Sequence, residues 1–383
     1  MKIVSIKRTP LLCRLGQDYH WAQGLTLWSQ VILIEIQTDE GIVGIAESGA
    51  GPSFVPMLSI LDDAIPYFIG KSVFDGNKLI WDYHREAFRA RGIGVHNFYT
   101  RIMSGIELAL WDAIGKAMRQ PLHRILGGAI RDRISYFGFV QGDTPQELAQ
   151  HAKELKGAGY KVLYVKVGRG DTLDLQIVAA VRDAIGDVRL RLDANDAWDS
   201  LTANRMLERL KPFDIEMVEQ PVPGLRGAEA LARIRAAGVP LAADSSCNTP
   251  EDVYEMCRTR AVDVVVVGLH ETCGVVRYRK AAAIAEAANV RICIHGIFET
   301  GITTCAGLQV GATISNLDDG NQIMCQLLAE DLVASPNLAP IEGALPVPQT
   351  PGLGFELDAD AVARAAEAYR RQMERGGFAL GAF

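Results

Sequence analysis

Three short apolar runs lie close together in the chain: VLYVKVG (162–168), VRLRLDAN (188–195) and IEMVEQP (215–221). Their length and β-branched residues are typical of buried strands, and the segment SLTANRMLERLKPF (200–213) has the apolar spacing of an amphipathic helix. Strands that alternate with helices predict parallel β-α units, since each helix returns the chain to the start of the next strand.

The same alternation continues on both sides of this stretch. A helix opened by Thr-Pro is predicted over TPQELAQHAKELKGAG (144–159). The other strand candidates are ISYFGFV (134–140), VPLAADS (239–245), VDVVVVG (262–268), VRICIHG (290–296) and QIMCQLL (322–328). Eight such units predict a closed parallel barrel, whereas an open doubly wound sheet would have fewer units and a glycine-rich phosphate loop.

The first 128 residues have a different, α+β pattern. Strands are predicted over Lys2–Lys7, from Val31 (VILIEIQ), and after a turn at residues 39–41, and a helix is predicted over residues 100–118. Pro121 and the Gly127-Gly128 pair end this region. We therefore predict three parts: residues 1–128, a barrel over residues 129–345, and a C-terminal segment 346–383 with a helix over residues 360–376.

Composition narrows the class of protein. The 383 residues carry a net charge of −7, which argues against nucleic acid or an anionic membrane as the main partner. No apolar run reaches the ~18 residues of a membrane span, and the N-terminus reads as a strand, not a signal peptide. The seven cysteines include no CxxC pair, which favours reduced thiols and a cytoplasmic protein.

Five chemically capable residues stand at the ends of the predicted strands: Lys166, Asp193, Glu219, Asp244 and His295. They are 27, 26, 25 and 51 residues apart, the last interval covering two units. One β-α unit is about that long, so the side chains are expected on the same rim of the barrel, where active sites of this fold form. Taken singly, each is more often a cap, a surface lysine or a core histidine; the shared spacing favours a functional site.

The three carboxylates suit a hard divalent cation. Mg²⁺ is the expected ion, with Mn²⁺ as a substitute, because no cysteine or paired histidine favours zinc. A cation beside a carboxylate substrate stabilises the enediolate that forms when the α-proton is removed. Lys166, with its pKa lowered by the metal and by partial desolvation, is the predicted base.

The motifs around these residues resemble the enolase superfamily, in its mandelate racemase and muconate lactonizing enzyme branch. MSGIELALWDAIGKAMRQPLHRILGG (103–128), VKVG, LDAN, VEQP and AADSS occur in the order of that family, over essentially the whole chain. The resemblance implies a modified (β/α)₇β TIM barrel with an α+β capping domain built from both chain ends. It also implies metal ligation by Asp193, Glu219 and Asp244, a base at Lys166, and a homo-oligomer, commonly a dimer or octamer.

Departures from the family pattern bear on the reaction. Tyr164 replaces the first lysine of the usual Lys-x-Lys motif, and Gly268 replaces the second catalytic lysine, or the aspartate that orients the histidine in the racemase type. His295 matches the seventh-strand histidine of that racemase type. Glu299, in FETG, matches a glutamate common in the lactonizing branch and is expected to orient the site. A lysine and histidine pair also resembles sugar-acid lactone cycloisomerases of this superfamily.

Four further residues are weaker candidates. Asn195 is expected to hydrogen-bond near the metal. His270 is a candidate substrate contact, with a loop histidine of no special role as the equal alternative. His20 and Trp21 are expected in a loop between the first two strands, which in this family covers the active site; a plain solvent loop is the alternative.

We therefore expect an isomerase or lyase that acts on a small carboxylate, a hydroxy or sugar acid or its lactone. A cycloisomerase or a racemase/epimerase ranks ahead of an acid-sugar dehydratase. An alternative of another class is a catalytically impaired barrel that binds metal or carboxylate, which the glycine at position 268 favours and the intact carboxylates oppose.

Overall fold

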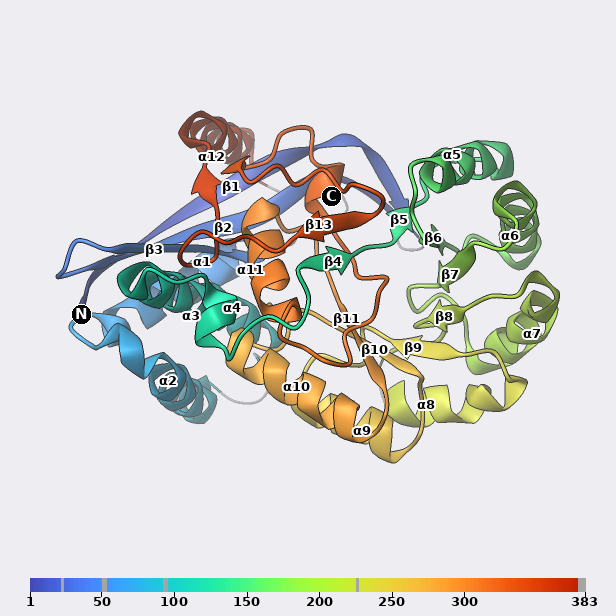
Figure 1. Ribbon diagram of the computed structural model, residues 1–383, viewed down its shortest axis with the longest axis horizontal. Helices are drawn as coiled ribbons and strands as arrows, with labels where there is room; N and C mark the ends of the chain where they lie inside the picture. Colours follow the sequence, from blue (N-terminus) through green and yellow to red (C-terminus); the bar gives the residue numbers. More distant parts are fainter. Residues whose placement is uncertain (22–23, 50–53, 92–95, 225–226, 378–383) are drawn as a thin grey trace.

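The computed structural model describes residues 1–21, 24–49, 54–91, 96–224 and 227–377. Figure 1 shows two regions side by side: an antiparallel sheet with helices from the first part of the chain, and a curved parallel sheet with helices on its outer side. This is the modified TIM barrel with a capping domain that the sequence predicted.

The antiparallel sheet has the order β1-β2-β3, with β1 Ile3–Trp21, β2 Gly24–Thr38 and β3 Val43–Gly49. The first two strands are far longer than predicted, because their pairing runs from Ile3 opposite Thr38 to Trp21 opposite Gly24. Polar residues interrupt the apolar alternation of this hairpin, so the sequence pattern does not indicate its length. The backbone pairing of β1 with β2 shows it. The loop predicted around His20 and Trp21 is therefore wrong: their backbone belongs to β1.

Four helices accompany this sheet: α1 Phe54–Phe68, α2 Gly76–Arg91, α3 His96–Met118 and the short α4 Leu122–Ile125. The central helix α3 lies very close to β3. A Cβ at Gly44 would stand 2.1 Å from the Ala109 carbonyl oxygen, and one at Gly105 would stand 2.1 Å from Ser48 Oγ. Glycine at these two positions allows the helix to approach the strand.

The C-terminal helix α12, Ala359–Glu374, lies beside β1 (Figure 1). Ala361 and Ala365 on this helix share a buried cluster with Leu11 on β1 and Leu33 on β2. The end of the chain thus packs against the N-terminal sheet. The boundaries at residues 128 and 345 stay predictions.

The parallel sheet has seven strands in the order β11-β10-β9-β8-β7-β6-β5. Their bounds are β5 Gly138–Phe139, β6 Val162–Lys166, β7 Arg189–Asp193, β8 Met217–Glu219, β9 Leu241–Ala243, β10 Val264–Val267 and β11 Arg291–Ile294. The intervening helices are α5 Pro145–Gly157, α6 Asp171–Ile185, α7 Ser200–Leu210, α8 Gly227–Ile234, α9 Pro250–Arg258, α10 Val275–Ala287 and α11 Gly301–Gly311.

The eighth predicted strand, QIMCQLL, is wrong: residues Cys325–Leu327 form a 3₁₀ helix. The two edges of the sheet are instead joined by the segment just before it. The Asn321 side chain accepts a hydrogen bond from Ile294 N (2.8 Å) and donates one to the Ser135 carbonyl oxygen (3.0 Å). Gln322 N donates to the Ile294 carbonyl oxygen (3.0 Å). A side-chain amide thus replaces part of a strand ladder, which apolar periodicity does not reveal.

Short connecting strands and helix caps complete the fold. The remaining strands are β4 Arg133–Ser135, β12 Val333–Ser335, β13 Ala344–Pro346 and β14 Glu356–Leu357. Thr144 caps α5 in a reciprocal pair with Glu147, as the Thr-Pro start predicted.

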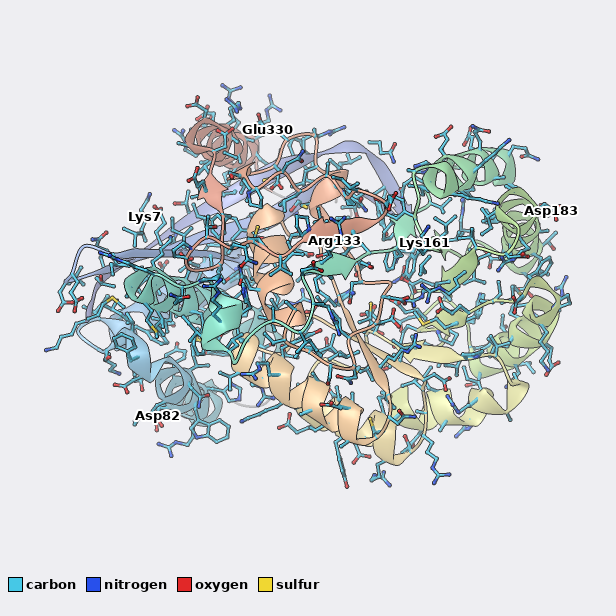
Figure 2. All side chains as sticks on the ribbon, viewed as in Figure 1. Lys7, Asp82, Arg133, Lys161, Asp183 and Glu330 are labelled. Carbon is cyan, nitrogen blue, oxygen red and sulfur yellow. The ribbon has the colours of Figure 1, made fainter. Side chains whose placement is uncertain are left out.

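Charged side chains such as Asp183 on α6 extend outward (Figure 2). No helix among the described residues is long and apolar enough to cross a membrane.

Candidate active site

The predicted rim is formed by the carboxyl ends of neighbouring strands. Lys166 on β6 is paired directly with Asp193 on β7, and Asp193 is paired with Glu219 on β8. Paired residues of a parallel sheet point to the same face, so these three side chains lie side by side. Asp244 follows β9 and His295 follows β11. All five predicted residues therefore gather at one end of the sheet.

Asp193 is held in place from three directions. Its Oδ2 accepts hydrogen bonds from Lys166 Nζ (2.5 Å) and from the Tyr164 hydroxyl (2.6 Å), and its Oδ1 accepts one from the backbone N–H of Asn195 (2.7 Å). Asn195 has φ +43°, in the left-handed region of the backbone. Tyr164 and Asn195 thus both fix a predicted metal ligand.

The pKa of Lys166 is shifted in the opposite direction from the one that the sequence analysis expected. Burial alone lowers the pKa of this ammonium, but the negative charge of Asp193, with Tyr19 and Glu219, outweighs burial and raises the pKa above its usual value. The expected lowering of the Lys166 pKa relied on the positive charge of a bound metal ion. The protein's own groups around Lys166 are carboxylates and a tyrosine, which act in the opposite direction. Lys166 is therefore held as an ammonium by the carboxylates alone.

The three carboxylates form a buried anionic cluster. Burial, followed by the charges of Asp193 and Asp244, raises the pKa of Glu219 well above its usual value. Burial also raises the pKa of Asp244, against the lowering effect of His295. Carboxylates crowded together in this way are a donor set that fits a divalent cation.

The side chains would have to turn to bind such an ion. Among the residues that the structure describes, no group of three His, Cys, Asp or Glu side chains is arranged to hold a metal ion. Lys166 occupies one oxygen of Asp193, and His295 Nε2 lies 3.4 Å from Asp244 Oδ1. The two basic groups thus stand at the oxygens that a cation would use.

His295 has a carboxylate partner that the sequence analysis missed. Its Nδ1 lies 2.9 Å from Glu271 Oε1, and since a carboxylate only accepts, Nδ1 carries the proton. Burial lowers the pKa of His295, but Asp244 and Glu271 outweigh it and raise the pKa to about 10. Although burial raises the pKa of Glu271, the charge of His295 and its hydrogen bond bring that pKa to about 2.

Gly268 explains how Glu271 reaches the histidine. A Cβ at this position would stand 2.0 Å from Glu271 Oε2, so the glycine leaves room for the carboxylate. A turn closed by Thr272 N and the Gly268 carbonyl oxygen (3.1 Å) folds the segment back. Gly268 suggested that the residue that orients the histidine had been lost. The structure shows instead that this glycine leaves room for Glu271, three residues later, to contact His295. A glutamate soon after a strand-end glycine is the signal that could have indicated it.

Both ring nitrogens of His270 are engaged within the protein. It is buried, with Nδ1 2.8 Å from Ser104 Oγ and Nε2 3.0 Å from Thr303 Oγ1. Burial lowers its pKa to about 4, so the ring is neutral. Thr303 in turn bonds to Glu47 on β3 (2.7 Å). His270 is therefore a buried histidine that links the two regions, and its role as a substrate contact stays a prediction.

Glu299 lies near His295 without bonding to it. Its Oε2 accepts a hydrogen bond from Ile297 N (2.5 Å), and burial raises its pKa to about 8. Tyr19 on β1 also lies beside Lys166, and its ring packs against Phe139 (5.5 Å between centroids). Burial raises the pKa of its hydroxyl, against the lowering effect of Lys166. The side chains of His20 and Trp21 lie outside the described residues.

Two family models match the chain. Residues 18–127 match the N-terminal domain of mandelate racemase / muconate lactonizing enzyme, and residues 147–361 match the enolase C-terminal domain-like model. The chain belongs to the mandelate racemase / muconate lactonizing enzyme family. The resemblance that the motifs suggested is thereby confirmed.

Relatives of the chain carry out isomerisations. Chloromuconate cycloisomerase of Cupriavidus pinatubonensis is 31% identical, over 97% of this chain and 98% of that protein. D-galactarolactone cycloisomerase of Agrobacterium fabrum is 28% identical, over 94% and 98%. The structure of a dipeptide epimerase from Enterococcus faecalis, solved with Mg and the dipeptide L-Leu-L-Tyr, has a TM-score of 0.84 at 27% identity and covers 93% of this chain and 100% of that one. This chain is an isomerase of the enolase superfamily.

Proposed function

We propose that this isomerase removes the proton α to the carboxylate of a small acid at Lys166 and returns a proton from His295. The observation that carries the proposal is the position of the two basic groups: Lys166 Nζ contacts Asp193, while His295 Nε2 lies beside Asp244. A substrate carbon above the carboxylate cluster would have a lysine on one face and an imidazole on the other.

Each basic group is held so that its proton is exchanged at a defined atom. Asp193, which also accepts a hydrogen bond from Tyr164, fixes the end of the Lys166 side chain, which would take the α-proton on Nζ. Glu271 holds the proton of His295 on Nδ1, so that Nε2 is the atom that gives or takes a proton. Return of a proton to the opposite face would give epimerisation. Cleavage of a β-carbon–oxygen bond after loss of the α-proton would instead form a double bond and open a lactone, with the departing oxygen taking a proton from His295, and the reverse addition would close the ring.

Asp193, Glu219 and Asp244 would hold Mg²⁺, with Mn²⁺ as a substitute. The bound ion supplies positive charge at the acid's carboxylate and at the three ligands, which lowers the proton affinity of Lys166 and stabilises charge that develops on the substrate. The family's relatives support this choice, since the E. faecalis dipeptide epimerase was solved with Mg. A homo-oligomer and a cytoplasmic location stay predictions.

Solvent exchange tests the proposed base. In D₂O with Mg²⁺, the protein should exchange the α-proton of an accepted acid for deuterium, and Lys166→Ala should abolish that exchange. Lys161→Ala is a matched control, because this exposed lysine precedes β6 and so stands at the opposite end of the strand from Lys166. Full exchange by Lys166→Ala would disprove the assignment of the base.

A melting experiment separates the enzyme from a binding barrel. Mg²⁺ should raise the melting temperature, EDTA should reverse the effect, and Asp193→Asn should remove it. A metal response without turnover of any acid in a carboxylate library would favour the catalytically impaired binder. Elimination of water from an acid sugar, without epimerisation, would favour the dehydratase.

A further inference from the structure

A pocket of about 540 Å³ begins at Lys166 and extends away from the three carboxylates. It lies between β1, helix α5 and the carboxyl ends of β5 and β6. Its polar walls include Gln17, Gln141, Asp143, His151, Glu154 and Arg169. None of the proposed metal ligands lines it. A volume in this range exceeds what proton transfer at one carbon requires and is typical of a site for a small ligand.

Hydrogen-bonding groups in this pocket are left available to a ligand. Within the described part of the chain, the side-chain amides of Gln17 and Gln141 have no hydrogen-bond partner. The His151 ring accepts a hydrogen bond at Nδ1 from Gln141 N (2.9 Å), which leaves its Nε2 as a donor. The walls therefore offer both donors and acceptors at close spacing.

The charges of the pocket argue against a second carboxylate. Asp143, Glu147 and Glu154 line it, while Arg169 is the cation that joins Lys166 there. Glu147 is already bonded to the N–H groups of Asp143 and Thr144 at the start of α5. Arg169 Nη2 donates to the Asp143 carbonyl oxygen (2.6 Å). An anionic tail would be repelled by three carboxylates, and the guanidinium of Arg169 is already hydrogen-bonded within the protein.

An apolar tail fits no better. Val140 and Leu148 are the apolar side chains of the lining, and a hydrocarbon tail would strip water from the amides and carboxylates without replacing their hydrogen bonds. We propose that this pocket binds a neutral polyhydroxylated tail, so that the substrate is a polyhydroxy acid or its lactone. The inference rests on the proposed function, because the α-carbon must lie at Lys166 for the tail to enter the pocket.

The test compares acids that share a carboxylate end and differ in the tail. With Mg²⁺ in D₂O, α-proton exchange is measured for epimeric six-carbon polyhydroxy acids, for 2-hydroxyhexanoate, for the corresponding six-carbon polyhydroxy dicarboxylates, and for 2-hydroxypropanoate, which has no tail. The best polyhydroxy acid should have a kcat/KM at least about tenfold above those of 2-hydroxyhexanoate and of its own dicarboxylate, since an apolar tail cannot pair with the polar lining and a second carboxylate would meet its negative charges.

Two variants locate the preference in the pocket. Gln141→Leu should lower the ratio of kcat/KM for the best polyhydroxy acid over 2-hydroxyhexanoate about tenfold. Gln146→Leu, on the exposed side of α5 and outside the lining, should leave that ratio unchanged. Glu154→Gln should raise the relative rate of the dicarboxylate several-fold by removing a repulsive charge.

The outcomes separate the two proposals. If 2-hydroxyhexanoate or a dicarboxylate exchanges faster than every polyhydroxy acid, or if Gln141→Leu keeps the wild-type ratio, the pocket assignment is wrong while the proposed function stands. If no acid exchanges, 2-hydroxypropanoate included, the proposed function is wrong and the pocket assignment falls with it.

Discussion

The two faces of the candidate site are built in different ways. On the lysine face, Lys166 and its partner Asp193 are paired residues on adjacent strands of one sheet. On the histidine face, His295 is oriented by Glu271, which lies in the turn after β10 and not on a strand. The lysine face is therefore fixed by sheet register, while the histidine face depends on how a loop is folded and packed.

The histidine face also reaches into the other region of the molecule. His270, the neighbour of Glu271, contacts Ser104 on α3, and through Thr303 it is linked to Glu47 on β3. Glu47 further accepts hydrogen bonds from Thr300 N (2.9 Å) and Oγ1 (2.8 Å) at the start of α11. Substitutions in the N-terminal sheet that disturb these hydrogen bonds should therefore affect the position of His295 more than that of Lys166.

Among variants of the residues that position the two basic groups, the largest expected effect comes from Glu271→Gln. Loss of the carboxylate charge removes the group that holds the Nδ1 proton, so kcat for isomerisation should fall on the order of 100-fold. Exchange that starts at Lys166 should fall much less. Glu251→Gln, which alters an exposed carboxylate paired with Arg277, is the control. Equal loss of both activities would show that the two faces are not independent.

Gly268→Ala should give a smaller effect of the same kind. The added Cβ would displace the Glu271 carboxylate from His295, and kcat should fall about tenfold, less than with the charge removed. In the double variant with Glu271→Gln the two losses should not add, because both act through one contact. Gly157→Ala is the control, since its Cβ would meet no atom within 4 Å. Additive losses would mean that Gly268 has a separate role.

The smallest effect concerns the link to Glu47. Burial raises the pKa of Glu47 to about 7, above the value of an unfolded chain, so the folded state binds this proton more tightly. Its contribution to stability is then present at low pH and is lost as the pH rises from about 4.5 to about 7. Glu47→Gln should flatten the fall in unfolding free energy over that window by up to about 3 kcal/mol.

Denaturant unfolding at several pH values measures this difference. Glu374→Gln, at the exposed end of α12, is the control and should keep the wild-type pH dependence. An unchanged slope in Glu47→Gln would contradict a raised pKa for this carboxyl group.

The same contrast explains what the sequence could predict. The shared position of Lys166, Asp193 and Glu219 at one end of the sheet could be predicted from spacing, because short apolar strands fix the register. Their roles stay predictions. Glu271 was missed because a turn, and not a period, brings it to His295. The long β1–β2 hairpin and the closure at Asn321 were missed for a related reason: backbone pairing and a side-chain amide hold them, and neither leaves an apolar pattern.

The most direct test of the two-face account is His295→Asn in D₂O. If Lys166 and His295 serve opposite faces, this variant should lose isomerisation by about 10³-fold or more while it still exchanges the α-proton of the substrate for deuterium through Lys166. Loss of exchange together with turnover, in a variant that remains folded and still responds to Mg²⁺, would contradict the division of the site into a lysine face and a histidine face.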